Sequence, residues 1–436
     1  MFYDLIILRI DNKAGFLMDF RPNPLLYGAH DGFFSSFKLV VTMCDVVDRN
    51  IFLQAVENAI KRYPYFCVYP KKTGESIRLQ FNELPVPVFE DDRCVVLGTP
   101  ESNGHLLAFG LEGKKIILHA SHYIADGMGI SPLLMTVLYL YVSQRYGTQG
   151  LNSKRILMPN DLVMNEEYTY PFPEKAILSD DEEVQNNSQN QPYLLSSDAF
   201  DDQGLYAYHL RIPQSAMMGV ANPSDGSPVS FLSVMLYRAF CSLDKGINKP
   251  VVVHVQHQYR AAINAPFNRH SLVSYIPVTL SPRIRERRVE LQNTIIRGQV
   301  IVGSEPEADL RSVNRLVSVF KNDKALSLEK KKQAMCEYVE KSICGKTFGI
   351  SYVGKMDWCG LDKYVEDLHA YIGEKNTQNM LLIEVMTVGE DFSLNFMQSG
   401  RGDRYVNAFI EQFKSFGIPV SLVGEERYTL CDTKIP

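Results

Sequence analysis

Residues 122–127 read HYIADG and lie between a predicted strand and a predicted helix. The preceding residues 115–121 are mostly apolar and β-prone, which favours a strand that ends at the histidine. Downstream, Ser131-Pro132 is typical of a helix N-cap and first helical position, and residues 133–145 carry apolar side chains at helical spacing. A histidine held at the end of a strand is well placed to transfer a proton, so this stretch predicts an enzyme.

The composition is typical of a soluble protein with more than one lobe. The chain has 436 residues, of which 45% are hydrophobic and 22% charged, and its net charge is -5. This length exceeds one ordinary hydrophobic core, so we expect two subdomains. The negative net charge argues against binding to nucleic acid or anionic lipid through charge attraction. We expect no signal peptide and no membrane span, because the start lacks a basic leader and no eighteen apolar residues run together.

The eight cysteines are scattered along the chain, and none belongs to a C-x-x-C pair. This spacing argues against a zinc site and against a disulfide framework. We therefore expect no bound metal and a location in the reducing cytoplasm.

The chain divides into two halves that each alternate strand-like and helical stretches, residues 1–178 and 203–436. Between them, residues 179–202 are acidic and rich in amides, and they offer little apolar surface to bury. This composition predicts a linker or mobile loop. We expect a mixed α/β (α+β) fold with two lobes of similar size and a ligand site at the seam between them.

Residues 122–127 can carry proton-transfer chemistry. An ordinary histidine has a pKa of about 6.5, so His122 can accept a proton near neutral pH. Asp126 and Gly127 suit a tight turn, since aspartate tolerates unusual turn geometry and glycine permits positive φ. On a regular strand His119 and His122 point to opposite faces, which disfavours a His-x-x-His metal site. A purely structural histidine buried in the core is the alternative interpretation.

The motif and the order of elements resemble a superfamily of acyl-transferring proteins. It includes chloramphenicol acetyltransferase, alcohol acetyltransferases, plant acyl-CoA-dependent acyltransferases and nonribosomal peptide condensation domains. The family pattern is His-His-x-x-x-Asp-Gly, and here Ser121 replaces the first histidine, which favours a free-standing acyltransferase similar to the alcohol acetyltransferases. Weaker resemblances cover most of the chain, at residues 48–64, 206–212, 227–230, 258–260, 275–278 and 351–354.

The resemblance implies two chloramphenicol-acetyltransferase-like lobes, each a mostly β sheet flanked by helices, with a tunnel between them. His122 would act as general base and remove the proton of an alcohol or amine that attacks an acyl thioester. Asp126 is the second predicted catalytic residue, and Gly127 completes the turn. Arg260 is the preferred ionic partner of Asp126, placed on one strand face with a polar row, and Arg62 is the alternative.

The resemblance also implies a way to bind the substrates. Ser351, Gly354 and Gln398 are the candidates for substrate binding or for stabilising an oxyanion. No tightly bound cofactor is expected, and acyl-CoA or a carrier-bound thioester would serve as co-substrate beside a small-molecule acceptor. One alternative is a stand-alone condensation-type amide synthase that works with an acyl carrier protein. Another is a catalytically silent homologue used for binding, because Ser121 and Tyr352 depart from the family pattern.

Overall fold

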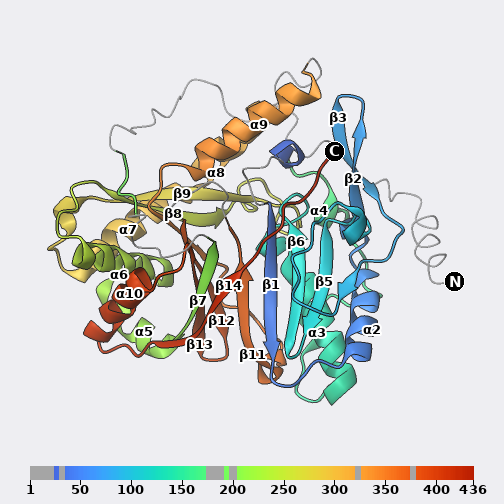
Figure 1. Ribbon diagram of the computed structural model, residues 1–436, viewed down its shortest axis with the longest axis horizontal. Helices are drawn as coiled ribbons and strands as arrows, with labels where there is room; N and C mark the ends of the chain where they lie inside the picture. Colours follow the sequence, from blue (N-terminus) through green and yellow to red (C-terminus); the bar gives the residue numbers. More distant parts are fainter. Residues whose placement is uncertain (1–23, 29–34, 173–190, 196–203, 320–325, 374–379) are drawn as a thin grey trace.

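A computed structural model describes residues 24–28, 35–172, 191–195, 204–319, 326–373 and 380–436. Their strands form two large sheets with helices packed on them, which confirms the expected mixed α/β fold with two lobes (Figure 1). Most of the expected linker at residues 179–202 lies outside the described residues, so the lobe boundaries stay a prediction.

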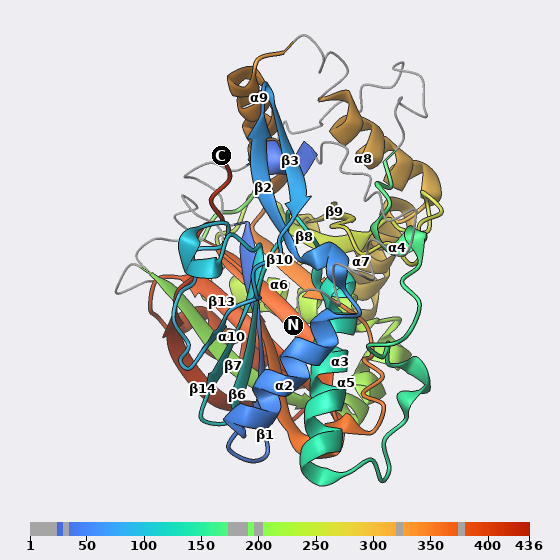
Figure 2. The same ribbon diagram turned by 90° about the vertical axis from the view of Figure 1, so that its right-hand side faces the viewer.

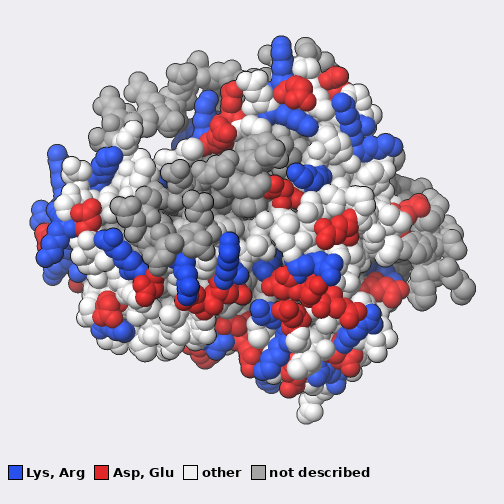
Figure 3. All heavy atoms as spheres, viewed as in Figure 1, with Lys and Arg blue, Asp and Glu red and all other residues white. Residues whose placement is uncertain are grey.

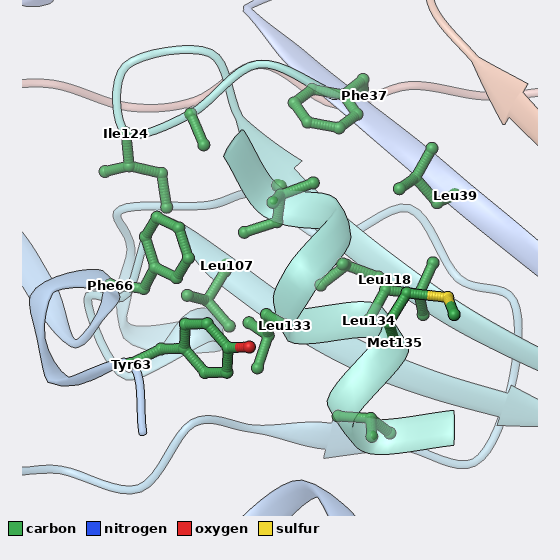
Figure 4. Packing of buried hydrophobic residues seen from close by; sticks show 14 of the residues in the cluster. Phe37, Leu39, Tyr63, Phe66, Leu107, Leu118, Ile124, Leu133, Leu134 and Met135 are labelled. Atoms are coloured by element: carbon green, nitrogen blue, oxygen red, sulfur yellow. The ribbon is translucent and has the colours of Figure 1, made fainter. Parts of the chain in front are cut away.

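The first sheet has five strands and ends at the HYIADG motif. In spatial order its strands are β11 (Val365–Tyr371), β1 (Ser36–Met43), β6 (Lys115–Ser121), β5 (Leu107–Glu112) and β4 (Val88–Phe89). One buried cluster joins this sheet to the helices α2 (Arg49–Ile60) and α3 (Gly127–Tyr146). Figure 4 shows the contact, in which Leu133 and Leu134 of α3 lie near Leu107 and Leu118 of the sheet. This packing fixes the start of α3 against the end of β6.

The second sheet has seven strands. In spatial order they are β14 (Ser421–Tyr428), β7 (Leu205–Pro213), β13 (Asp391–Ser399), β12 (Leu381–Val388), β10 (Phe348–Tyr352), β8 (Val251–Gln258) and β9 (Val273–Leu280). Strand β10, the fifth in this order, pairs in parallel with its neighbours β8 and β12, and the other pairs in this sheet are antiparallel. A second buried cluster joins the sheet to α6 (Pro228–Leu243), α7 (Val289–Gly303) and α10 (Arg404–Ser415). These helices cover one face, while residues of the other face either pack against the first sheet or border a cavity.

The remaining elements lie around these two sheets. They are the hairpin of β2 (Val68–Thr73) and β3 (Ser76–Phe81), and the helices α4 (Asn165–Tyr168), α5 (Gln214–Ala221), α8 (Pro306–Ser318) and α9 (Leu328–Ile343). Short 3-10 helices are η1 (Pro24–Gly28), η2 (Pro64–Phe66), η3 (Pro100–Ser102), η4 (Ser153–Arg155), η6 (Asn222–Ser224), η7 (Pro282–Ile284) and η9 (Leu361–Tyr364). The hairpin reaches α9, where Lys331 Nζ donates to the carbonyl oxygen of Glu75 at 2.8 Å (Figure 2).

Strand β11 connects the two sheets. Although it belongs to the second half of the sequence, it pairs antiparallel with β1 at the edge of the first sheet. A third buried cluster lies between the sheets and includes Val40 and Ile117 from the first and Leu382 and Met397 from the second. The second half of the chain therefore completes the sheet that carries the motif.

The C-terminal segment is tied to the first sheet. It runs from β14 past β1 (Figure 1), and Cys431 forms a disulfide with Cys94, 337 residues earlier. The Ser36 hydroxyl donates to the Cys431 carbonyl, and Thr433 Oγ1 lies 3.0 Å from Ser121 Oγ. The sequence analysis expected no disulfide framework and a reducing cytoplasm. This bond was not foreseen, and it argues against that compartment because disulfides persist mainly in oxidising environments.

Helix α3 begins earlier than the sequence analysis expected. Asp126 is its N-cap and accepts a hydrogen bond from the Gly129 backbone N–H at 2.7 Å, so Ser131 and Pro132 lie inside the helix. Both Asp and Ser are good N-cap residues, so the local signals competed, and proline at the first helical position favoured the Ser131 start. With the Asp126 start, Pro132 lies inside the helix, beyond the first turn where proline is best tolerated. The Asp126 start prevails because its carboxylate also has partners in the second lobe.

The surface carries both signs of charge. On the face in Figure 3, Lys and Arg side chains are interspersed with Asp and Glu side chains. Among the helices that the structure describes, none is both long and apolar enough to cross a bilayer.

Candidate active site

A cavity of about 1440 Å³ is lined by residues of both sheets. The first sheet contributes Phe37 and Leu39 of β1 and the turn with His122. The second sheet contributes the face that its helices leave uncovered. On β12, for example, Ile383 packs in the helix-covered core while Glu384 lines the cavity, as strand alternation requires.

His122 follows the last residue of β6 and is half-buried in the cavity wall. Its backbone N–H donates to the Ser35 carbonyl at 2.7 Å, and its ring lies 4.5 Å from the Phe37 ring, centroid to centroid. Burial lowers the pKa of His122, although the Asp126 charge and a hydrogen bond with the Ala125 backbone raise it. The imidazole is therefore neutral near pH 7 and can accept a proton.

Asp126 holds the turn after His122 and is almost fully buried. One carboxylate oxygen, Oδ1, accepts from Arg260 Nη2 at 2.8 Å as well as from the helix. The other oxygen, Oδ2, accepts from the Leu272 backbone N–H at 2.9 Å. The expected pair with Arg260 is formed, and it locks the motif of the first lobe to a loop of the second. These hydrogen bonds hold the turn after His122 in place, and a catalytic role for Asp126 stays a prediction.

Arg260 itself lies beyond the end of β8 and not on the strand as expected. Its Nε donates to the Asn268 carbonyl at 3.0 Å, and its Nη2 also donates to the His270 carbonyl at 2.8 Å. The alternative partner of Asp126, Arg62, is engaged elsewhere. It forms a buried two-pronged pair with Glu167, with distances of 2.7 and 3.1 Å.

Ser121, at the position of the first histidine in the His-His-x-x-x-Asp-Gly pattern, is buried and hydrogen-bonded within the protein. It is fully buried, its hydroxyl bonds to Thr433 of the C-terminal segment, and the backbone N–H of Tyr123 donates to its oxygen at 3.3 Å. Gly127 lies at the first position of α3 and lines the cavity next to the motif. A side chain there would point toward Val353 of the second lobe, 4.0 Å away.

Ser351 lines the cavity from β10, and its side chain hydrogen-bonds to Glu384 on the neighbouring strand β12. The two residues are register partners. Burial raises the pKa of Glu384 to about 7, an effect that the Ser351 hydrogen bond only reduces. Sequence reasoning missed Glu384, although a single acidic residue within the apolar run at residues 380–388 was a usable signal.

Two of the expected site residues do not line the cavity. Gln398 is fully buried, and its Nε2 donates to the carbonyls of Gly400 at 3.0 Å and Gly402 at 2.7 Å. Alternation along β13 places Gln398 on the helix-covered face with Phe396, away from the cavity. Gly354 has φ +87° in the loop after β10 and is outside the lining.

Known proteins resemble this chain in structure but not in sequence. No protein-family model matches it, and no curated protein sequence matches it. TRI101 of F. graminearum, solved with coenzyme A and T-2 mycotoxin, has a TM-score of 0.56 at 10% identity, covering 91% of this chain and 97% of that one. Polyketide synthase associated protein 5 of Mycobacterium tuberculosis has a TM-score of 0.54 at 12% identity, covering 89% and 95%.

A third similar structure is the condensation domain of the monacolin K polyketide synthase MokA. Its TM-score is 0.52 at 11% identity, over 91% of this chain and 95% of that one. These likenesses span nearly the whole chain. The chain therefore shares its fold with TRI101, the polyketide synthase associated protein and the condensation domain, and this agrees with the two-lobed fold that the sequence resemblance implied.

Proposed function

We propose that this protein is an acyltransferase that moves an acyl group from a thioester to an alcohol or amine, with His122 as general base. The observation that carries the proposal is the neutral imidazole in the wall of a cavity lined by both lobes. A cavity of about 1440 Å³ has room for two substrates to meet. The similar TRI101 structure contains coenzyme A, which supports acyl-CoA as the donor.

In the proposed reaction, His122 takes the proton of the acceptor O–H or N–H while the acceptor atom attacks the thioester carbonyl carbon. The carbonyl electrons move to oxygen, and a tetrahedral oxyanion forms. Its collapse breaks the C–S bond, and the thiolate recovers the proton from the imidazolium. The products are an ester or amide and a free thiol, so no further reactant is needed.

The oxyanion requires a hydrogen-bond donor, commonly worth about 3 kcal/mol. Ser351 supports this role because its hydroxyl lines the cavity. Its hydrogen bond to Glu384 competes with donation to an oxyanion while that carboxyl group is ionised. We assign no step to Gln398 or Gly354, and no step requires a tightly bound cofactor.

A thiol-release assay tests the proposal across acyl-CoA donors with alcohols and amines. His122→Ala should reduce turnover by about a hundredfold or more, the usual range for positioned acid–base catalysis. His119→Gln is the matched control, because His119 lies on β6, the strand that leads to His122, and is outside the cavity lining. Thermal unfolding of both variants shows whether the fold is intact. Unchanged turnover in a folded His122→Ala protein would reject His122 as the base.

The condensation-type alternative gains support from the similar MokA condensation domain. It differs from the leading proposal in the donor, which would be a thioester on an acyl carrier protein. The same assay distinguishes the two. Transfer from carrier-bound donors alone, with no turnover of any acyl-CoA, would favour the condensation-type enzyme.

A further inference from the structure

The C-terminal segment, residues 431–434, is tied to the first lobe at two points. Cys431 forms the disulfide with Cys94, and the Lys434 backbone N–H donates to the Leu97 carbonyl at 2.8 Å. Both cysteines of the disulfide are half-buried and not fully enclosed. A small thiol reductant therefore has access to the bond.

Two hydroxyl contacts join this segment to the strand ends beside the motif. The Ser36 hydroxyl of β1 donates to the Cys431 carbonyl. The Thr433 hydroxyl donates to Ser121 Oγ of β6 at 3.0 Å. Ser36 and Ser121 are register partners, so both contacts fall at the same level of the first sheet. Thr433 is 4% exposed and Ser121 is fully buried, so loss of their hydrogen bond would leave a buried hydroxyl unsatisfied.

The same strand ends hold His122. Ser121 directly precedes it, and the Ser35 carbonyl accepts the His122 backbone N–H at 2.7 Å. Phe37 places its ring 4.5 Å from the imidazole, centroid to centroid. Ser36 lies between Ser35 and Phe37 in the chain. The contacts of the C-terminal segment are therefore one residue away from each group that fixes His122.

We propose that residues 431–434 position His122 for acyl transfer and that the disulfide between Cys94 and Cys431 controls this positioning, so that the oxidised protein is the fully active form. This inference rests on the proposed role of His122 as base. None of these four described residues lines the cavity, so the segment acts through the strand ends and not by touching a substrate. Without the disulfide, only a few individually weak hydrogen bonds and packing contacts hold the segment.

The reduction is balanced by a thiol reductant. Two thiol groups of the reductant lose two electrons and two protons and form a disulfide of their own. The bond between the Sγ atoms of Cys94 and Cys431 breaks, and each cysteine gains one electron and one proton. Reoxidation reverses both changes.

The first test removes the Thr433 hydroxyl. Thr433→Val has nearly the same shape but cannot donate to Ser121, so it should lower kcat by about fivefold or more, with KM for the acyl-CoA donor changed by less than about twofold. Thr433→Ser keeps the hydroxyl and should keep kcat within about twofold of the wild type. Thr42→Val makes the same change at the far end of β1, opposite Lys115, and should leave kcat unchanged. Equal kcat values in Thr433→Val and Thr42→Val would overturn the proposal.

The second test reduces the disulfide under native conditions. Dithiothreitol should lower kcat of the wild-type protein by about fivefold or more, and reoxidation should restore it. The ester or amide product is measured by chromatography, because added thiol would mask thiol release. Cys94→Ser should show the lowered kcat from the start and no response to reductant, which controls for the six other cysteines. A wild-type kcat that stays constant after complete reduction would overturn the proposal.

A pH profile separates positioning of His122 from a general loss of structure. Burial lowers the pKa of His122, so strand ends that loosen and admit water should move the pKa read from the kcat/KM profile up toward the ordinary value of about 6.5. Thr433→Val and the reduced wild type should show this rise, whereas Thr42→Val should not. A lower kcat with an unchanged pKa would mean a purely structural effect and would reject the positioning role.

Hydrogen exchange separates failure of this inference from failure of the proposed function. The His122 backbone N–H is bonded to Ser35, so exchange in peptides that cover residues 121–126 should become faster in Thr433→Val and in the reduced wild type. Faster exchange in a protein that turns over no acceptor would support the hold on the motif and reject acyl transfer. Turnover that depends on His122, with kcat and exchange unchanged by Thr433→Val and by reduction, would leave acyl transfer standing and reject the inference.

Discussion

Replacing Glu384 by glutamine should stabilise the protein at alkaline pH and not at acidic pH. Burial raises the pKa of this carboxyl group from 4.5 to about 7, so the folded protein holds the proton more tightly than the unfolded chain does. The wild-type protein therefore loses stability as the pH rises from about 4.5 to about 7, and the loss is complete above that range. Between pH 5 and pH 8 this amounts to about 2–3 kcal/mol.

Glutamine has nearly the same shape and does not titrate, so it should escape this loss. The free energy of unfolding can be measured in urea from the fluorescence of Trp358, the single tryptophan of the chain. The variant should gain about 2–3 kcal/mol over the wild type on going from pH 5 to pH 8. The exposed control Glu366→Gln should show no such trend. A difference between variant and wild type that stays constant with pH would refute the view that Glu384 is buried without a counter-charge.

Three further predictions follow from other parts of the structure. Burial lowers the pKa of His122, so the pKa read from the acid side of the kcat/KM pH profile should lie below the ordinary histidine value of about 6.5. A pKa above about 6.5 in that profile would contradict this. Arg260→Leu leaves buried Asp126 without its counter-ion and should lower the free energy of unfolding in urea by about 3–5 kcal/mol. A loss below about 1 kcal/mol would contradict a stabilising ion pair between Arg260 and Asp126. Under denaturing conditions iodoacetamide should label six cysteines without reductant and eight with it, and labelling of all eight without reductant would exclude the bond between Cys94 and Cys431. Cys94→Ser should lower the free energy of unfolding by about 2–4 kcal/mol.

A local pattern was sufficient to place His122, and the family resemblance was needed to choose the partner of Asp126. The apolar strand and the small residues around the motif position the histidine at the strand end, where the structure has it. The family resemblance, in which residues 258–260 match a segment that contributes a structural arginine, led to Arg260 as the partner of Asp126, and the structure has this pair. Strand alternation put Arg260 on a strand, which was wrong because β8 ends at Gln258. Charge pairing is thus easier to foresee than the exact end of an element.

Contacts between distant segments could not be read from the sequence. Glu384 meets Ser351 only because β10 and β12 pair in parallel, and nothing local specifies that pairing. Cys94 and Cys431 are 337 residues apart, and cysteine spacing carries no information on partners at such a separation. Gln398 was placed at the tunnel because its segment resembles a late family strand whose polar side chains border the tunnel, whereas its position in the alternation of β13 turns it to the other face.

The pairing of β11, from the second half of the chain, with β1 of the first sheet has a practical consequence for experiments on separate halves. A fragment that ends near residue 178 would lack the strand that pairs with β1, and β1 would present a bare hydrogen-bonding edge to other chains. Such a fragment should aggregate when produced alone and recover solubility when co-expressed with residues 203–436. Complementation in trans, with two plasmids, is therefore the way to study the halves separately.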